Sequence, residues 1–287
     1  MKIDKLPFSR STFPKMNNRL RALPAKFQIL IFLLLTFLFS WSIEYVMIRG
    51  AGVNDMGLTF LLMWTPGICG ILCAALFKDI GSLGFKWGNL KSYALAYGIP
   101  AATAMLILGL LIATKEGSFN GEVSSTKVTR WFIAITVGVL IGSVSALGEE
   151  IGWRGFLQTK FQQAGIRGRY LWLGIIWAIW HWPLILFSNY ATSSLPALSL
   201  LLFTICIVSF AVIIGWLKDI SGSVFVAALA HGAHNLWIQF AYPVFLIKGP
   251  RDEFFGGESG LFNAAIYLLL AIYIYRKKLR QLPTNPV

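Results

Sequence analysis

The stretch Glu149-Glu150-Ile151-Gly152-Trp153-Arg154-Gly155 places two adjacent carboxylates and an arginine between two long apolar runs. An ionised side chain inside an apolar phase is energetically costly, so residues of this kind are functional candidates by default. Glu150 and Arg154 are four residues apart, a spacing that lets them pair along one helix. The alternative is therefore that the stretch is a cytoplasmic helix end with a local ion pair.

The composition of the chain is typical of a polytopic membrane protein. Hydrophobic residues make up 56% of the 287 residues, charged residues only 13%, and the mean hydropathy is +0.68. An apolar run of about 17 to 25 residues can cross a bilayer as a helix. The sequence therefore predicts an all-α fold, a transmembrane helical bundle of about eight spans. The predicted spans are 27–48, 56–77, 92–114, 129–148, 170–188, 197–217, 221–243 and 260–275.

The basic residues indicate the orientation of the bundle rather than a nucleic-acid partner. Although the net charge is +13, most Lys and Arg residues flank the apolar runs. Eighteen of them fall on the side of both termini and six on the other side. Since cytoplasmic loops carry the excess of Lys and Arg, both termini are predicted to be cytoplasmic.

The predicted organisation is a single membrane domain with two short tails. Residues 1–26 form a basic cytoplasmic tail, residues 27–276 the transmembrane helical domain, and residues 277–287 a second cytoplasmic tail. The three cysteines lie in apolar runs and predict neither a disulfide framework nor a cysteine metal site. Two pairs of glycines four residues apart predict close packing between helices. They are Gly138 with Gly142, and Gly148 with Gly152.

All three histidines of the chain lie in apolar runs. Glu149, His181 and His231 are each 11 or 12 residues from a charged residue on the cytoplasmic side, which corresponds to about 16 to 18 Å along a helix. Three separate helices thus place polar groups at a similar depth, provided that the helix carrying Glu149 continues to about Phe161. His231 and Asn235, four residues apart, share one face of their helix.

These side chains are suited to two kinds of hydrolysis. A glutamate can act as general base on a water molecule, and a histidine with an asparagine amide can stabilise a tetrahedral oxyanion. Alternatively, Glu149, His181 and His231 could hold a divalent metal such as zinc, whose bound water attacks the substrate. The spacing of the residues leaves both schemes open.

Three motifs in order resemble those of the CAAX prenyl protease and bacteriocin-processing (CPBP) family of intramembrane proteases. They are Glu149-Glu150-x-x-x-Arg154, an aromatic-x-x-x-His motif from Trp177 to His181, and His231-x-x-x-Asn235. The family usually has phenylalanine where this chain has Trp177. The resemblance implies that Glu149 activates the water, that His181 assists it, and that His231 and Asn235 form the oxyanion site.

The resemblance further implies Glu150 and Arg154 as a supporting pair and leaves His234 without a role. It predicts an intramembrane endopeptidase, in a family described as metalloproteases, that acts on a membrane-associated or lipidated (CAAX-like) peptide. The active site would open to the cytoplasm, in a bacterial plasma membrane or, in a eukaryote, the endoplasmic reticulum. The alternatives are a proton-coupled transporter and a non-catalytic immunity or scaffold membrane protein.

Overall fold

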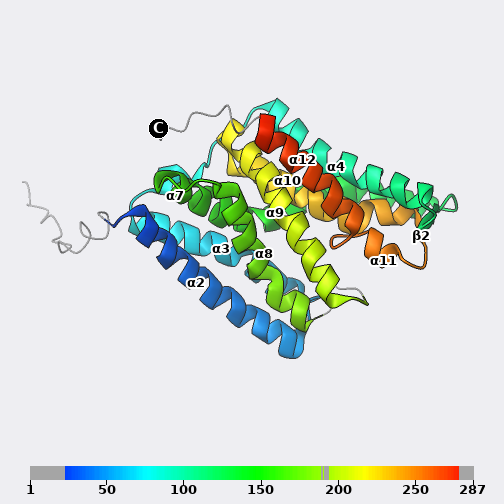
Figure 1. Cartoon of the computed structure of the whole chain (residues 1–287), viewed down its shortest axis with the longest axis horizontal. Coiled ribbons are helices and arrows are strands. Elements are labelled where there is room, and N and C mark those ends of the chain that lie inside the picture. Colours follow the sequence, from blue (N-terminus) through cyan, green and yellow to red (C-terminus); the bar gives the residue numbers. More distant parts are fainter. Residues whose placement is uncertain (1–22, 189, 191–193, 278–287) are drawn as a thin grey trace, which may run out of the picture.

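The computed structural model describes residues 23–188, 190 and 194–277, and it is an all-α bundle as predicted (Figure 1). Most of both predicted tails, residues 1–22 and 278–287, lies outside the described residues. The first half of the described chain contains α2 (Ala25–Val46), η1 (Met47–Ala51), α3 (Met56–Leu76), η2 (Ile80–Leu83), α4 (Leu90–Ala113), β1 (Gly117–Phe119), α5 (Ser125–Ile133), η3 (Ala134–Gly138) and α6 (Val139–Glu150). The second half contains η4 (Ile151–Leu157), α7 (Gln158–Gln163), α8 (Arg169–Phe187), α9 (Pro196–Ser221), α10 (Val224–Leu236), η5 (Trp237–Ala241), η6 (Tyr242–Phe245), β2 (Leu246–Lys248), α11 (Asp252–Phe255) and α12 (Leu261–Lys277).

Six helices in the described part of the chain are long and apolar enough to cross a membrane. They are Ala25–Gly50, Met56–Leu76, Leu90–Ala113, Ser125–Gln163, Arg169–Phe187 and Pro196–Ser221. The other two predicted spans are shorter in the structure. The helix α10 has 13 residues before it widens into the π-helical η5, and α12 has 17 residues.

One helix of 39 residues, Ser125–Gln163, carries the Glu149-Glu150 pair through the bundle. The prediction that this helix continues past Glu149 is confirmed. Its regular hydrogen bonding widens into π-helical turns twice, at η3 and at η4, and η4 begins directly after Glu150. Such π-turns occur frequently at functional sites.

Glycines allow α3 to pack directly on this long helix. A Cβ atom on Gly148 would lie 2.6 Å from the Cα of Trp64, and one on Gly152 would lie 2.5 Å from the carbonyl carbon of Pro66. On the other face, a Cβ atom on Gly142 would lie 2.8 Å from Leu236 of α10. Close helix packing is thus confirmed for Gly142, Gly148 and Gly152, whereas a Cβ atom on Gly138 would meet only ordinary contacts at 3.6 Å.

We expect Gly152→Ala to destabilise the protein by about 1 to 3 kcal/mol, because the methyl group would meet backbone atoms of α3 that cannot move independently. The measurement is the thermal unfolding midpoint of the purified protein in detergent. The matched control is Gly109→Ala in α4, where a Cβ atom meets nothing within 4 Å, and this change should leave stability unchanged or slightly improved. Equal midpoints for the two variants would contradict the packing role of Gly152.

The helices alternate in direction, so their ends gather at two faces of the bundle (Figure 1). At the first, which we call the basic end, Lys160 Nζ lies 2.6 Å from Asp79 Oδ2 and Arg169 Nη2 lies 2.6 Å from Asp219 Oδ2. Here α9 turns into α10 through Gly222, in the left-handed region at φ 67°, and Ser223, whose hydroxyl accepts from the first amides of α10. The predicted spans 197–217 and 221–243 are thus joined by a tight turn.

The opposite face, which we call the distal end, is formed by the connections 47–55, 114–124, 188–195 and 237–260, as far as these are described. The strands β1 and β2 pair antiparallel there, with Ser118 opposite Ile247. Ion pairing between Arg251 and Glu116 and a 2.5 Å hydrogen bond from Ser194 Oγ to Glu253 Oε1 join its segments. The two ends therefore differ in charge, since six of the eight Asp and Glu residues at the two ends of the described chain lie at the distal end. They are Asp55, Glu116, Glu122, Asp252, Glu253 and Glu258.

Candidate functional site

The four predicted catalytic residues line one cavity of about 180 Å³, whereas the predicted supporting pair, Glu150 and Arg154, does not. Glu149 comes from α6, His181 from α8, and His231 and Asn235 from α10. The convergence of polar groups from three separate helices, expected from the sequence, is thereby confirmed. Glu149 is 2% exposed and His231 5% exposed, so the predicted water-activating carboxylate lies at the closed side of the cavity.

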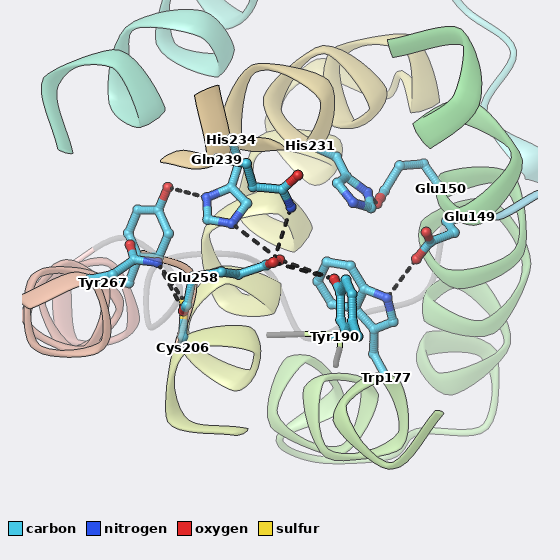
Figure 2. Close-up of polar contacts among 11 residues, drawn as sticks. Glu149, Glu150, Trp177, Tyr190, Cys206, His231, His234, Gln239, Glu258 and Tyr267 are labelled. Carbon is cyan, nitrogen blue, oxygen red and sulfur yellow. Dashed lines mark hydrogen bonds and ion pairs between the residues drawn. The ribbon is translucent and has the colours of Figure 1, made fainter. Parts of the chain in front are cut away.

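Glu149 and Glu150 have different partners. Glu149 Oε2 accepts a 2.7 Å hydrogen bond from the indole Nε1 of Trp177, as Figure 2 shows. Glu150 Oε1 lies 2.9 Å from Arg154 Nη1 and 2.8 Å from His231 Nδ1. Both Glu150 and Arg154 are fully buried. The ion pair that the spacing predicted is therefore present, but inside the bundle rather than at a helix end.

These contacts determine which ring nitrogens carry hydrogen. The Nδ1 atom of His181 lies 2.9 Å from the carbonyl oxygen of Trp177, which can only accept, so Nδ1 donates and Nε2 keeps its lone pair. His231 Nδ1 likewise donates to Glu150, because that carboxylate is the acceptor for Arg154 as well. Both histidines are thus oriented by a second group, and Trp177 orients both Glu149 and His181.

The distal side of the cavity contains polar residues that the sequence analysis did not select. They are Tyr190, Gln239 and Glu258, together with His234, which the resemblance left without a role. Glu258 is in contact with the other three, as Figure 2 shows. Burial raises the pKa of the Glu258 carboxyl to about 6, although the hydrogen bond from Gln239 opposes this shift.

Glu44 on α2 is another intramembrane carboxylate that the sequence analysis missed. It is fully buried, and among the described residues neither of its oxygens has a hydrogen-bond partner. A signal was present in the sequence, because Glu44 is the only Asp, Glu, Lys, Arg or His residue in the predicted span 27–48.

The sequence analysis named Glu149, His181 and His231 as possible metal ligands, but these three side chains are not arranged to bind one metal ion. Within the described part of the chain, no group of three or more His, Cys, Asp or Glu side chains could hold a metal ion. Glu149, His181 and His231 line the same cavity, but they are not grouped closely enough to form such a set. We therefore assign no step to a metal.

The cavity opens towards the distal end. His181 lies about 9 Å along α8 from the last residue of that helix at the distal end and about 18 Å from the first residue at the basic end. The buried lining residues include Glu149, Trp177, His231 and His234. The exposed or partly exposed lining residues come from the distal half of the bundle, and they are Val53, Thr59, Met63, Tyr190, Asn235, Gln239 and Glu258.

A carboxylate, two oriented imidazoles and an amide thus surround one cavity of an all-helical bundle with membrane-spanning helices, an arrangement suited to hydrolysis within a membrane. Residues 129–237 match the family model of the Rce1-like type II CAAX prenyl endopeptidases. This match, which covers 109 of the 287 residues, agrees with the resemblance inferred from the three motifs. The family is one of intramembrane endopeptidases, which implies a bilayer and a peptide substrate. No curated protein matches the chain.

Proposed function

We propose that the protein hydrolyses a peptide bond in a membrane-associated or lipidated peptide, with Glu149, His181, His231 and Asn235 as its catalytic residues. The observation that carries the proposal is that these four residues line one cavity of about 180 Å³. All four lie within residues 129–237, the segment that matches an endopeptidase family. The whole membrane domain, residues 27–276, would form the catalytic unit.

In this proposal Glu149 takes a proton from a water molecule, whose oxygen attacks the carbonyl carbon of the scissile bond. The Nε2 lone pair of His181 accepts the other hydrogen of that water and orients it. The C–N bond then breaks, and the proton held by Glu149 passes to the leaving amine. No step requires a cofactor.

The oxyanion that forms during the attack needs hydrogen-bond donors placed in advance. His231 and Asn235 are one helical turn apart on α10 and both line the cavity. With Nδ1 held by Glu150, a protonated His231 would donate from Nε2, and the Asn235 amide would donate beside it. Arg154 and Glu150 would act by holding His231 in place.

The test is cleavage of membrane-tethered reporter peptides, prenylated and unprenylated, by the purified protein, with and without a chelator. Cleavage that survives the chelator is expected for a water activated by Glu149. Loss of cleavage with the chelator and its return with added zinc would contradict the metal-free scheme. Absence of cleavage throughout the panel would favour the transporter or scaffold alternatives.

The orientation of the site in the membrane follows from the charge of the two ends. Because the basic end carries the excess of Lys and Arg, we propose that it faces the cytoplasm. The cavity, which opens distally, would then face the opposite side of the membrane. This differs from the expectation of the sequence analysis that the site opens to the cytoplasm, because counting residues from the cytoplasmic boundary gave the depth of the site but not the direction of its opening.

We expect Gln239→Cys, at the exposed rim of the cavity, to react with a membrane-impermeant maleimide in intact cells that express the protein. The native cysteines Cys69, Cys73 and Cys206 are all buried and give a low background. The matched control is Gly81→Cys in the exposed η2 turn at the basic end, which should react only after the cells are opened. The reverse pattern would place the cavity mouth on the cytoplasmic side.

A further inference from the structure

Glu258, on the distal side of the cavity, is a carboxylate that the proposed hydrolysis does not use. Its side chain is 11% exposed. Oε2 accepts a 3.0 Å hydrogen bond from Gln239 Nε2, and the hydroxyl of Tyr190 lies 3.3 Å from Oε2 and 3.4 Å from Oε1. The Tyr190 contacts are long, so the carboxylate retains capacity for a further donor.

A second, independent feature of this place is the unpartnered ring nitrogen of His234. The side chain is 1% exposed and lines the cavity, and its Nδ1 atom lies 2.9 Å from the hydroxyl of Tyr267. Within the described residues its Nε2 atom has no hydrogen-bond partner and lies 4.0 Å from Glu258 Oε1 (Figure 2). A buried polar atom without a partner is costly, so a ligand group that pairs with Nε2 would be stabilised at this place.

The charge of the cavity favours a cation as that group. Its lining contains two carboxylates, Glu149 and Glu258, and within the described residues it contains no Lys or Arg. Arg154 is buried beside Glu150 behind the cavity wall and compensates that carboxylate instead. With His231 protonated, as in the proposed mechanism, the lining holds one positive group against two carboxylates, and a cavity with low-dielectric walls and an excess of negative charge attracts cations.

The geometry of the acceptors suits a primary ammonium group, which has three hydrogen-bond donors and no acceptor. Glu258 supplies its carboxylate, and Gln239, whose Nε2 donates to Glu258, retains its amide oxygen as an acceptor. His234 accepts at Nε2 when its Nδ1 donates to Tyr267. Gln239 and Glu258 also line a neighbouring hollow of about 290 Å³ at the distal end, through which a chain could reach them.

We propose that Glu258, with His234, Gln239 and Tyr190, binds a protonated primary amine of the substrate peptide, so that the protease prefers a lysine side chain or a free peptide amino terminus near the scissile bond. The preference in cleavage rests on the proposed function, whereas the binding of the amine does not. Glu258 is in this scheme a substrate-positioning residue.

The cleavage arm uses reporter peptides with lysine or acetyl-lysine at successive positions around the scissile bond, each with a free or an acetylated amino terminus. For at least one peptide with a lysine or a free amino terminus, we expect the kcat/KM of wild type to be at least tenfold higher than for the acetylated counterpart. Which peptide shows this preference identifies whether the amine belongs to a lysine side chain or to the amino terminus. Glu258→Gln should reduce this ratio to near one. The matched control, Glu253→Gln in the same connection, should retain the wild-type ratio.

The binding arm measures thermal unfolding with n-hexylammonium or, as the neutral comparison, n-hexanol. We expect the ammonium alone to raise the unfolding midpoint of wild type and of Glu253→Gln, but not that of Glu258→Gln. Equal responses to both probes, or an unchanged ammonium response in Glu258→Gln, would overturn the amine site. Amine binding without cleavage of any peptide would instead contradict only the proposed function.

The preference for an amine should also depend on pH. The pKa of Glu258 is raised to about 6 by burial, so the carboxylate is ionised at neutral pH and takes up a proton as the pH falls through this value. The ammonium then loses its charge partner. At pH values below 6, the wild-type ratio of kcat/KM for the amine-bearing peptide to kcat/KM for its acetylated counterpart should therefore decrease. Six other groups are in contact with Glu258 or within electrostatic range of it, namely Tyr190, His234, His231, Glu149, Cys206 and Tyr267. A ratio that stays constant between pH 5 and pH 8 would contradict the role of Glu258.

Discussion

Replacement of Glu149 by glutamine is expected to lower kcat for a cleaved reporter peptide by on the order of 10² to 10⁴, the range that general-base catalysis contributes. Glutamine has nearly the same shape, and its amide oxygen can still accept the hydrogen bond from Trp177 Nε1 that Glu149 Oε2 accepts at 2.7 Å. The substitution therefore preserves the packing while removing the ability to take a proton from water.

Two measurements separate loss of chemistry from loss of structure in this variant. The unfolding midpoint of Glu149→Gln should stay close to that of wild type. The companion variant Trp177→Phe keeps an aromatic ring but removes the indole donor, and it should reduce kcat by a smaller factor because the carboxylate remains. If Glu149→Gln cleaved as fast as wild type, the assignment of Glu149 as the base would be wrong.

The part of the site that could be predicted from sequence is the part whose signal is local. Glu149, His181 and His231 are ionisable groups inside apolar runs, and the rise of a helix converts their distance from flanking charges into a common depth. The His231–Asn235 spacing depends only on the helical repeat. These inferences needed no knowledge of how the helices pack.

The distal side of the cavity could not be predicted in the same way. Glu258 and Tyr190 lie in connections between helices, and their sequence distance of 68 residues gives no periodic signal. They meet because the connections at the distal end fold over one another, which is a property of the tertiary structure. The number of spans was likewise uncertain, since an apolar run such as 221–243 does not reveal that its regular helix widens at Trp237.

Removing Arg154 is expected to destabilise the protein by about 3 to 5 kcal/mol, the typical cost of leaving one partner of a buried ion pair uncompensated. Arg154 Nη1 lies 2.9 Å from Glu150 Oε1 with both side chains fully buried, and the guanidinium lies 4.2 Å from the centre of the Trp177 ring. Arg154→Ala would therefore leave the buried Glu150 carboxylate with His231 alone as its charge partner and remove the packing against Trp177. The measurement is the unfolding midpoint and the yield of folded protein in detergent.

The double variant Glu150→Gln with Arg154→Met distinguishes the charge from the packing. It removes both charges while keeping side chains of similar length, so most of the stability lost in Arg154→Ala should return, because replacing a buried ion pair with uncharged groups is often neutral. Its activity should stay below that of wild type, since His231 Nδ1 then donates to a neutral amide instead of a carboxylate. A partly exposed pair with the same four-residue spacing, Lys248 and Asp252 at 3.2 Å, supplies the control, and Lys248→Ala should change stability by less than about 1 kcal/mol. A double variant as unstable as Arg154→Ala would show that the contact with Trp177, and not the compensation of Glu150, is what Arg154 contributes.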